Sequence, residues 1–192
     1  MNAQGKRSGE TAREYAYRMI REQVISLELK PGEAFNDMEF AAKIGVSRTP
    51  VREAVIQLSE ESRIIEIFPQ RGMRIAPIDV ELVEEARSLR VLLEKQIAGM
   101  CCEMATEEDI KWLQENVGLQ EFYMENSRPE MVMQLDDEMH HKLFMICHRE
   151  LTYGMCQKLA IHYDRIRSLS VNTVKDNTII EDHRKIIQFI AE

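Results

Sequence analysis

Several features that mark membrane, secreted or metal-thiolate proteins are missing from this sequence. No apolar run is long enough to span a bilayer, and the opening MNAQGKRSGE has no apolar stretch behind it that would form a signal peptide. The four cysteines show no CxxC spacing, so we expect reduced thiols rather than a zinc or redox site. We therefore expect a cytoplasmic protein with no membrane partner.

Positive charges are outnumbered by negative charges overall, but the two are unevenly distributed. The formal net charge of the 192 residues is −8. Residues 1–76 contain 12 Lys and Arg against 11 Asp and Glu, whereas residues 77–192 contain 13 against 22. The acidity belongs to the C-terminal part, so an N-terminal part that binds nucleic acid through locally placed arginines is electrostatically allowed.

Periodicity and cap signals predict a winged helix-turn-helix domain in residues 1–76. Apolar residues recur at helical spacing in three segments, and a β pattern follows them. Gly45 separates the second helix from the third, as in a helix-turn-helix. The predicted elements are a helix over 10–27, a helix from Asn36 to Gly45, a helix capped by Ser47 or Thr49, and a β hairpin over 64–75.

Two arginines at the start of the third predicted helix are candidate DNA contacts. Arg48 and Arg52 are four residues apart and share one helix face, with Thr49 beside them. A guanidinium group can bind the major-groove edge of guanine in two places or clamp a phosphate. A solvated surface charge is the commoner explanation for an isolated pair of arginines, but this position in a helix-turn-helix favours DNA binding.

The β signals end near Pro77, and every later periodic segment is helical. Thr106 and Asp109 form a predicted capping box. The fold class we expect is mainly α, with a winged helix-turn-helix and small hairpin in residues 1–76 and an all-α domain in residues 77–192. The predicted helices of the second domain cover 79–104, 106–126, 129–147, 150–170 and 178–192.

Three inward-facing side chains of the second domain make a candidate metal site. At about 100° per residue, Asp136 and His140 project into an apolar sector, whereas Asp137 and His141 lie at its edge. His183 is central on the apolar side of the last helix. A lone inward histidine is more often a hydrogen-bonded core residue, but with Asp136 and His140 it completes a set that a divalent metal such as zinc or nickel would satisfy.

Two further polar side chains are predicted to face inward and are candidate effector contacts. Arg90 projects among apolar residues of its helix, and a buried guanidinium needs an anion. That anion is either a carboxylate of the chain, such as Glu94, or a carboxylate-bearing effector, and the internal pair is the commoner arrangement. His162 is predicted to lie in an apolar sector formed with Met155 and Leu159, where it would contact an effector or a metal ligand.

The N-terminal motifs resemble those of the GntR family of regulators. The resemblance rests on KPGE at 30–33, IGVSRTPVREA at 44–54 and PQRG at 69–72. It implies a dimeric winged helix on a palindromic double-stranded operator. The residues implied at bases, phosphates and the wing tip are Ser47, Arg48, Thr49, Arg52, Arg71 and Gly72. The chain departs from the usual family pattern at Met38 and at Ser62-Arg63.

The second half resembles the FCD-type effector domain of the same family, an antiparallel helical bundle. The resemblance lies in RVLLE at 90–94, DDEMHHKL at 136–143 and EDHRKI at 181–186. It implies a metal held by Asp136, His140 and His183, with a small organic acid nearby. It also implies a further histidine at the metal. In this chain His162 or a water molecule would take that position, unless the sequence is truncated at its C-terminus.

The main hypothesis is a homodimeric, sequence-specific DNA-binding regulator, expected to be a repressor, that an organic acid or a divalent metal controls. One alternative is a metal-dependent hydrolase built on Asp136, His140 and His183. No general base or nucleophile motif accompanies these residues, so we expect no enzyme activity. A nonspecific architectural DNA protein is disfavoured by the acidic C-terminal part.

Overall fold

The chain forms two compact units in a computed structural model that describes residues 5–173 and 178–192. The first unit comprises residues 1–83 and the second residues 84–192. Within the described ranges, no helix is both long and apolar enough to cross a membrane. The predicted fold class is confirmed, because a small antiparallel sheet occurs only in the first described unit and the second is helical.

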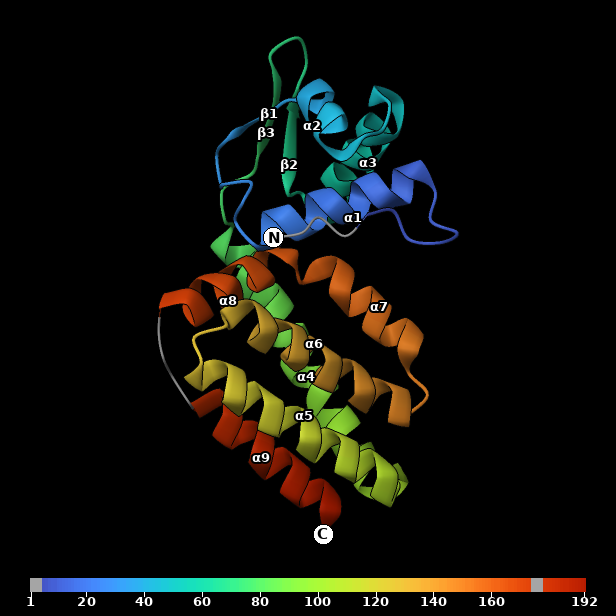
Figure 1. The fold of residues 1–192 in the computed structure, drawn as a ribbon, viewed down its shortest axis with the longest axis vertical. Coiled ribbons are helices and arrows are strands. Elements are labelled where there is room, and N and C mark those ends of the chain that lie inside the picture. Colours follow the sequence, from blue (N-terminus) through green and yellow to red (C-terminus); the bar gives the residue numbers. More distant parts are fainter. Residues whose placement is uncertain (1–4, 174–177) are drawn as a thin grey trace. The chain divides into compact units, whose positions relative to one another are not determined.

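The first unit packs three helices against a three-stranded antiparallel sheet (Figure 1). The strand order is β1-β3-β2, so the returning strand of the predicted hairpin lies in the middle. The short strand β1 pairs Phe35 with Met73 and was not predicted, because two residues are too few for a periodic signal. The elements are α1 (Ala12–Ile25), β1 (Ala34–Phe35), α2 (Asp37–Ile44), α3 (Arg48–Ser62), β2 (Ile65–Phe68) and β3 (Gly72–Ile75).

Local sequence signals set the ends of α2 and α3. The Asn36 side chain accepts hydrogen bonds from the backbone N–H groups of Met38 and Glu39, which caps α2. Gly45 ends α2 with a φ of 73°, a left-handed conformation that glycine adopts without a Cβ clash. Ser47 occupies the N-cap position of α3, and its side chain makes no capping hydrogen bond.

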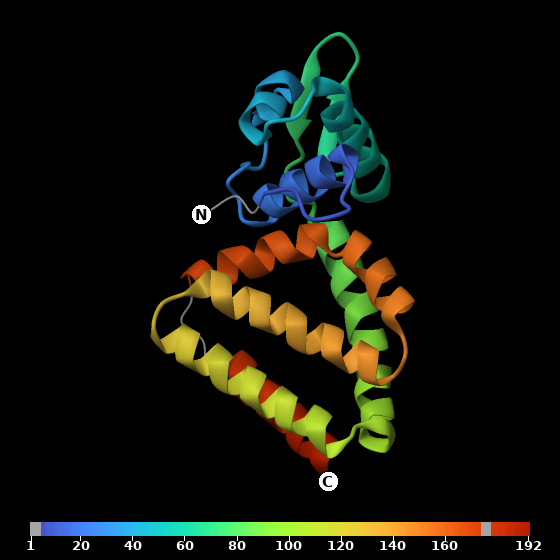
Figure 2. The same cartoon turned by 45° about the vertical axis from the view of Figure 1, so that its right-hand side comes forward.

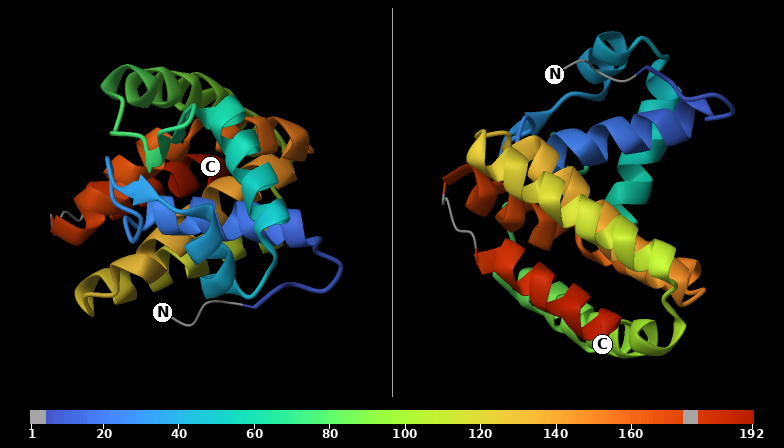
Figure 3. Two further views of the ribbon diagram at one scale, coloured as in Figure 1. Left: turned by 90° about the horizontal axis from the view of Figure 1, so that it is seen from above. Right: turned by 60° about the horizontal axis from the view of Figure 1, so that its bottom comes forward.

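The second unit is an assembly of helices whose core lies among α4, α5, α6 and α9. α5 and α9 lie side by side (Figure 2), and α9 also runs along the C-terminal end of α4 (Figure 3). Thr106 and Asp109 form both bonds of the predicted capping box of α5. The helices are α4 (Val80–Met104), α5 (Glu107–Glu125), α6 (Pro129–Ile146), α7 (Glu150–Leu159), α8 (Ile161–Thr173) and α9 (Thr178–Ala191).

The prediction of one helix over 150–170 was wrong. The chain breaks at Ala160 into α7 and α8, and neither glycine nor proline marks this break in the sequence. The apolar sector that the single helix would have formed does not exist, because Met155 and Leu159 are 70% and 52% exposed. His162 is nevertheless buried, at the start of α8.

Candidate functional site

The outer face of α3 presents the predicted DNA contacts. Ser47, Arg48, Thr49 and Arg52 are exposed, and the last three line a surface hollow of about 250 Å³. The opposite face of α3 anchors the helix to the first unit through four fully buried apolar side chains, namely Val51, Ala54, Val55 and Leu58. The helix therefore has the two-sided character that recognition in a DNA groove needs.

A buried carboxylate orients the two arginines of α3. Asp37, the first residue of α2, keeps only 4% of its side chain exposed, and its Oδ1 accepts a hydrogen bond from Arg48 Nε at 3.0 Å. Its Oδ2 lies 3.9 Å from Arg52 Nη1. The N-terminal end of a helix favours a negative charge, so the first turn of α2 suits an aspartate. Sequence reasoning missed this residue, although an acidic residue in the first turn of α2 is a usual helix-start signal.

Arg71 and Gly72 lie where the turn between β2 and β3 enters β3, and both are exposed. The turn is closed by a hydrogen bond from Arg71 N to Phe68 O at 3.0 Å. Gly72 has a φ of 99°, which a residue with a Cβ rarely adopts. The predicted wing therefore carries an exposed guanidinium at a backbone turn that requires glycine.

In the second unit, two helices bring together an acid–histidine cluster formed by Asp136, His140 and His183. Asp136 and His140 are one turn apart on α6, and His183 comes from α9. One ligand atom from each residue lies within 4.8 Å of the other two. His183 Nε2 is 3.5 Å from Asp136 Oδ1, and His140 Nε2 is 3.8 Å from Asp136 Oδ2. The predicted inward direction of these three side chains is confirmed, since their side-chain exposures are 12%, 12% and 7%.

Arg167 of α8 supplies the positive charge nearest to the cluster. Its guanidinium donates hydrogen bonds to Asp136 Oδ2 and, at 2.9 Å each, to Asp137 Oδ1 and Asp164 Oδ1. Burial by itself raises the pKa of Asp136, but the charge of Arg167, followed by His140 and His183, outweighs burial and lowers that pKa. Asp136 is therefore a carboxylate in spite of its position in the interior.

His183 is a neutral imidazole at neutral pH. Burial lowers its pKa to about 4, in spite of the opposing charge of Asp136. Its Nδ1 lies 3.0 Å from Gln120 Oε1 of α5, so the two ring nitrogens face different partners. A neutral ring has one nitrogen without a proton, and such a nitrogen can bind a metal.

Arg90 is paired with Glu94, one turn later on α4. Arg90 Nε and Nη2 both lie 2.9 Å from Glu94 Oε1, and the guanidinium lies over the Tyr163 ring, 5.3 Å from its centroid. The internal carboxylate that the sequence offered as a partner is thus the one used here. The same Glu94 oxygen lies 3.3 Å from His140 Nδ1, in a direction that makes no hydrogen bond.

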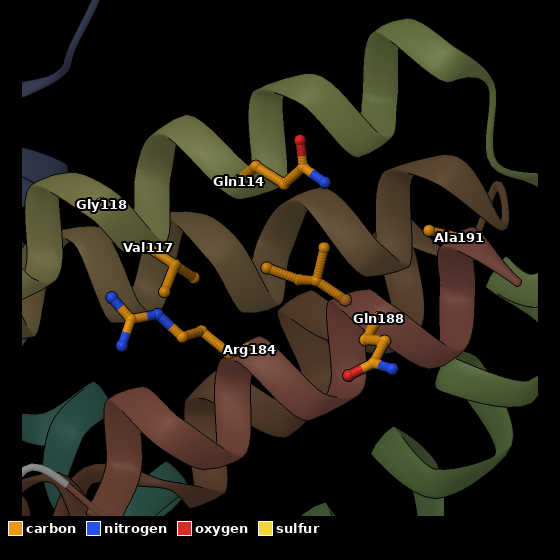
Figure 4. Close-up of a pocket in the computed structure, with 7 residues that line it drawn as sticks. Gln114, Val117, Gly118, Arg184, Gln188 and Ala191 are labelled. Carbon is orange, nitrogen blue, oxygen red and sulfur yellow. The ribbon is translucent and has the colours of Figure 1, made fainter.

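A separate hollow of about 370 Å³ lies between α5 and α9 (Figure 4). Arg184 and Gln188 enter it from α9, and Gln114 and Val117 enter it from α5. It contains no member of the acid–histidine cluster, because His183 faces the interior while its neighbour Arg184 faces this hollow. Its lining offers no acid or histidine that would bind a metal.

Comparison with known proteins identifies both units. Residues 12–75 match the gntR family of bacterial regulatory proteins, and residues 85–192 match the FCD domain. The chain belongs to the GntR family of transcriptional regulators. The expected resemblance is confirmed for both halves of this GntR protein, and with it the function of a DNA-binding regulator of transcription.

Individual relatives of this GntR protein are named as regulators. It is 30% identical over 158 residues to the HTH-type transcriptional repressor RspR of Escherichia coli strain K12, which covers 82% of this chain and 69% of RspR. It is also 30% identical over 190 residues to a Streptomyces ambofaciens HTH-type transcriptional regulator in an unstable DNA locus, covering 96% of this chain and 78% of that one. These names give no support to the hydrolase hypothesis.

A solved structure, E. coli McbR/YncC, has the same fold. Its TM-score with this GntR protein is 0.81 at 17% sequence identity, and the match covers 94% of this chain and 86% of the other. At this identity the match shows the fold alone.

Sequence reasoning found the cluster residues of this GntR protein but missed the polar groups behind them. Arg167 was missed because residues 150–170 were predicted to form a single helix. Asn116 and Gln120 are buried on α5, with 4% and 0% exposure. They are four residues apart among buried Leu113, Val117 and Met124, so the projection used for Asp136 and His140 would also have found them.

Proposed function

We propose that this GntR protein is a repressor whose second unit binds a divalent metal and a small organic acid, and thereby controls DNA binding by the first. Residues 1–76 are assigned to operator recognition, and residues 77–192 to sensing. The observation on which this assignment chiefly rests is the exposed face of Arg48, Thr49 and Arg52 on a helix whose other face is buried. Ser47 is assigned to the same DNA contact beside this face, and Arg71 and Gly72 are assigned to a contact made by the wing.

The residues of the acid–histidine cluster fit a divalent metal. A carboxylate and two imidazoles suit zinc, nickel and similar ions. Asp136 is ionised, and His183 is neutral at neutral pH. The buried Nδ1 of His140 receives no hydrogen bond from the residues that the structure describes. Asp136, His140 and His183 would hold the ion, which would supply positive charge and coordination positions for an oxygen of an organic acid.

A carboxylate-bearing effector is supported by the cations around the cluster. Arg90 and Arg167 keep only 14% and 13% of their side chains exposed, so an anion that reached them would be weakly screened by water. Arg90 is the proposed effector contact, since it has one intrahelical carboxylate, whereas Arg167 has three aspartates. His162, buried on α8, is proposed as a further contact.

A homodimer is supported by the surface of α7. Leu151, Met155 and Leu159 recur every fourth residue, so they form one stripe, with exposures of 88%, 70% and 52%. No residue of α7 is buried. Two recognition helices on a palindromic operator require two copies of the chain, and we propose that the second copy packs on this stripe.

Replacing Arg48 tests the DNA-reading face. We expect Arg48→Met to weaken binding to the DNA directly upstream of the protein's own coding sequence by about 1–3 kcal/mol, the usual contribution of a bidentate arginine. The measurement is a gel-shift titration at fixed salt, with in vitro transcription from the same fragment to show repression. Arg13→Met, which removes an exposed arginine from α1, is the matched control. Equal binding by both variants would contradict the assignment.

Removing single histidines tests the metal site. We expect wild-type protein to contain a stoichiometric divalent ion by mass spectrometry, and His140→Ala and His183→Ala to lose it. His141→Ala is the matched control, because His141 is adjacent in sequence but exposed and stacked on Tyr153. A metal-free wild type, after purification without chelators and incubation with zinc or nickel, would refute the metal proposal and leave the DNA assignment intact.

Calorimetric titration with a panel of small mono- and dicarboxylic acids tests the effector site. The acid that binds wild type is expected to bind Arg90→Met at least roughly tenfold more weakly, since a charge-assisted hydrogen bond contributes about 1.5–3 kcal/mol. Arg87→Met removes an exposed arginine from the same helix and should bind normally. An acid that binds both variants equally would exclude Arg90 as its contact.

Sedimentation velocity tests the dimer. We expect Leu151→Glu and Met155→Glu to shift the protein from dimer to monomer, because each buries a carboxylate in an apolar contact. Leu119→Glu, at an exposed apolar position on α5, should stay dimeric. If both α7 variants stay dimeric, the partner packs elsewhere, for example on α1; a monomeric wild type would refute the dimer itself.

A further inference from the structure

A chain of buried hydrogen bonds links His183 to the backbone of α6. Asn116 Nδ2 donates to Leu135 O at 3.2 Å, and Gln120 Nε2 donates to Asn116 Oδ1 at 2.8 Å. Gln120 Oε1 then lies 3.0 Å from His183 Nδ1. A buried donor or acceptor without a partner lowers the stability of the fold. Each of these amide NH₂ groups must therefore face an acceptor, and each amide oxygen must face a donor.

The backbone carbonyl at the far end fixes the direction of the whole chain. Leu135 O can only accept, so the Asn116 amide must present its NH₂ group there and its oxygen to Gln120. Gln120 must in turn present its NH₂ group to Asn116, which leaves its own oxygen for His183. The thioether of Met139, 3.8 Å from Gln120 Nε2, is also only an acceptor and favours the same orientation.

This direction determines which nitrogen of His183 bears the proton. Because Gln120 Oε1 only accepts, His183 Nδ1 must donate, and in the neutral ring Nε2 then has a lone pair. That lone pair faces Asp136 Oδ1 at 3.5 Å. Two acceptors that face one another in the interior are unfavourable unless a cation lies between them.

We propose that Asn116 and Gln120 are positioning residues that keep the Nε2 of His183 free of a proton and directed at the metal position. This inference rests on the proposed metal function. Hydrogen bonds to the outer nitrogen of a histidine ligand set its tautomer and its ring orientation, and their loss typically weakens metal binding by about 10- to 100-fold. The two amides thus act on the metal through His183, without touching it.

The tautomer can be measured without any metal. In metal-free protein at neutral pH, ¹⁵N-edited NMR of the imidazole rings is expected to show His183 protonated on Nδ1. Gln120→Leu removes the acceptor, so we expect the proton to move to Nε2, where Asp136 can accept it. Gln120→Glu in its protonated form keeps an oxygen acceptor for His183 Nδ1 and an O–H donor for Asn116 Oδ1, and should retain the wild-type tautomer. Gln114→Leu, an exposed position on the same helix, should leave the ring unchanged.

Zinc titration against a competing chelator gives the second readout. Gln120→Leu is expected to bind zinc about 10- to 100-fold more weakly than wild type, and Gln120→Glu and Gln114→Leu to stay within a few-fold. The fluorescence of Trp112, the only tryptophan and a residue of α5, checks that each variant is folded.

The outcomes separate this inference from the proposal on which it rests. A wild-type His183 protonated on Nε2 would overturn the positioning role, and this result needs no variant to fold. An unchanged tautomer and unchanged zinc affinity in folded Gln120→Leu would overturn it as well. If zinc fails to bind wild type while His183 is protonated on Nδ1 and responds to Gln120→Leu, the metal proposal fails and control of the tautomer by Gln120 stands.

Discussion

The carboxylate of Asp136 lies in the interior of the helical unit, where water contributes little to its solvation. An ionised group there is tolerated only if the surrounding residues supply charge and hydrogen bonds. Arg167 contributes the charge, and ring nitrogens of His140 and His183 lie 3.8 and 3.5 Å from the carboxylate oxygens. Much of the polar architecture of this unit, including the paired amides of α5 behind His183, follows from the need to surround one buried oxygen pair with suitable groups.

The DNA-binding unit uses a similar arrangement near its surface. Asp37 is buried at the start of α2 and restrains Arg48, whose own side chain is 56% exposed. A long arginine side chain loses rotamer freedom when it binds a ligand, so for the proposed DNA contact of Arg48 an existing restraint by Asp37 would reduce that loss. In both units, a buried aspartate therefore orients cationic side chains from a neighbouring helix.

The sequence was most informative where a regular helix made projection reliable. Asp136 and His140 were separated correctly from Asp137 and His141, because α6 runs without interruption through all four residues. Projection failed across Ala160, where the chain leaves one helix and starts another without a glycine or proline to signal the change. Because of that error, Arg167 was not recognised as a partner of Asp136, and His162 was predicted beside Met155 and Leu159, which are exposed. For Arg90, the sequence predicted an anionic partner, either a carboxylate of the chain such as Glu94 or an external acid. Contacts between distant segments, such as Gln120 with His183, depend on tertiary packing and were not predicted.

The way in which α8 is attached has a mechanical consequence. Among its described residues, the buried side chains are Ile161 and four polar groups, namely His162, Asp164, Arg165 and Ser168. Arg167 adds bonds to two aspartates of α6. The strength of an apolar contact does not depend on the charge of a nearby ligand. The strength of an ion pair does, because the ligand's charge adds to or opposes the pair's attraction. The described part of α8 is therefore attached to its unit largely by polar and charged groups, and a small charged molecule that entered among them would act on that attachment directly.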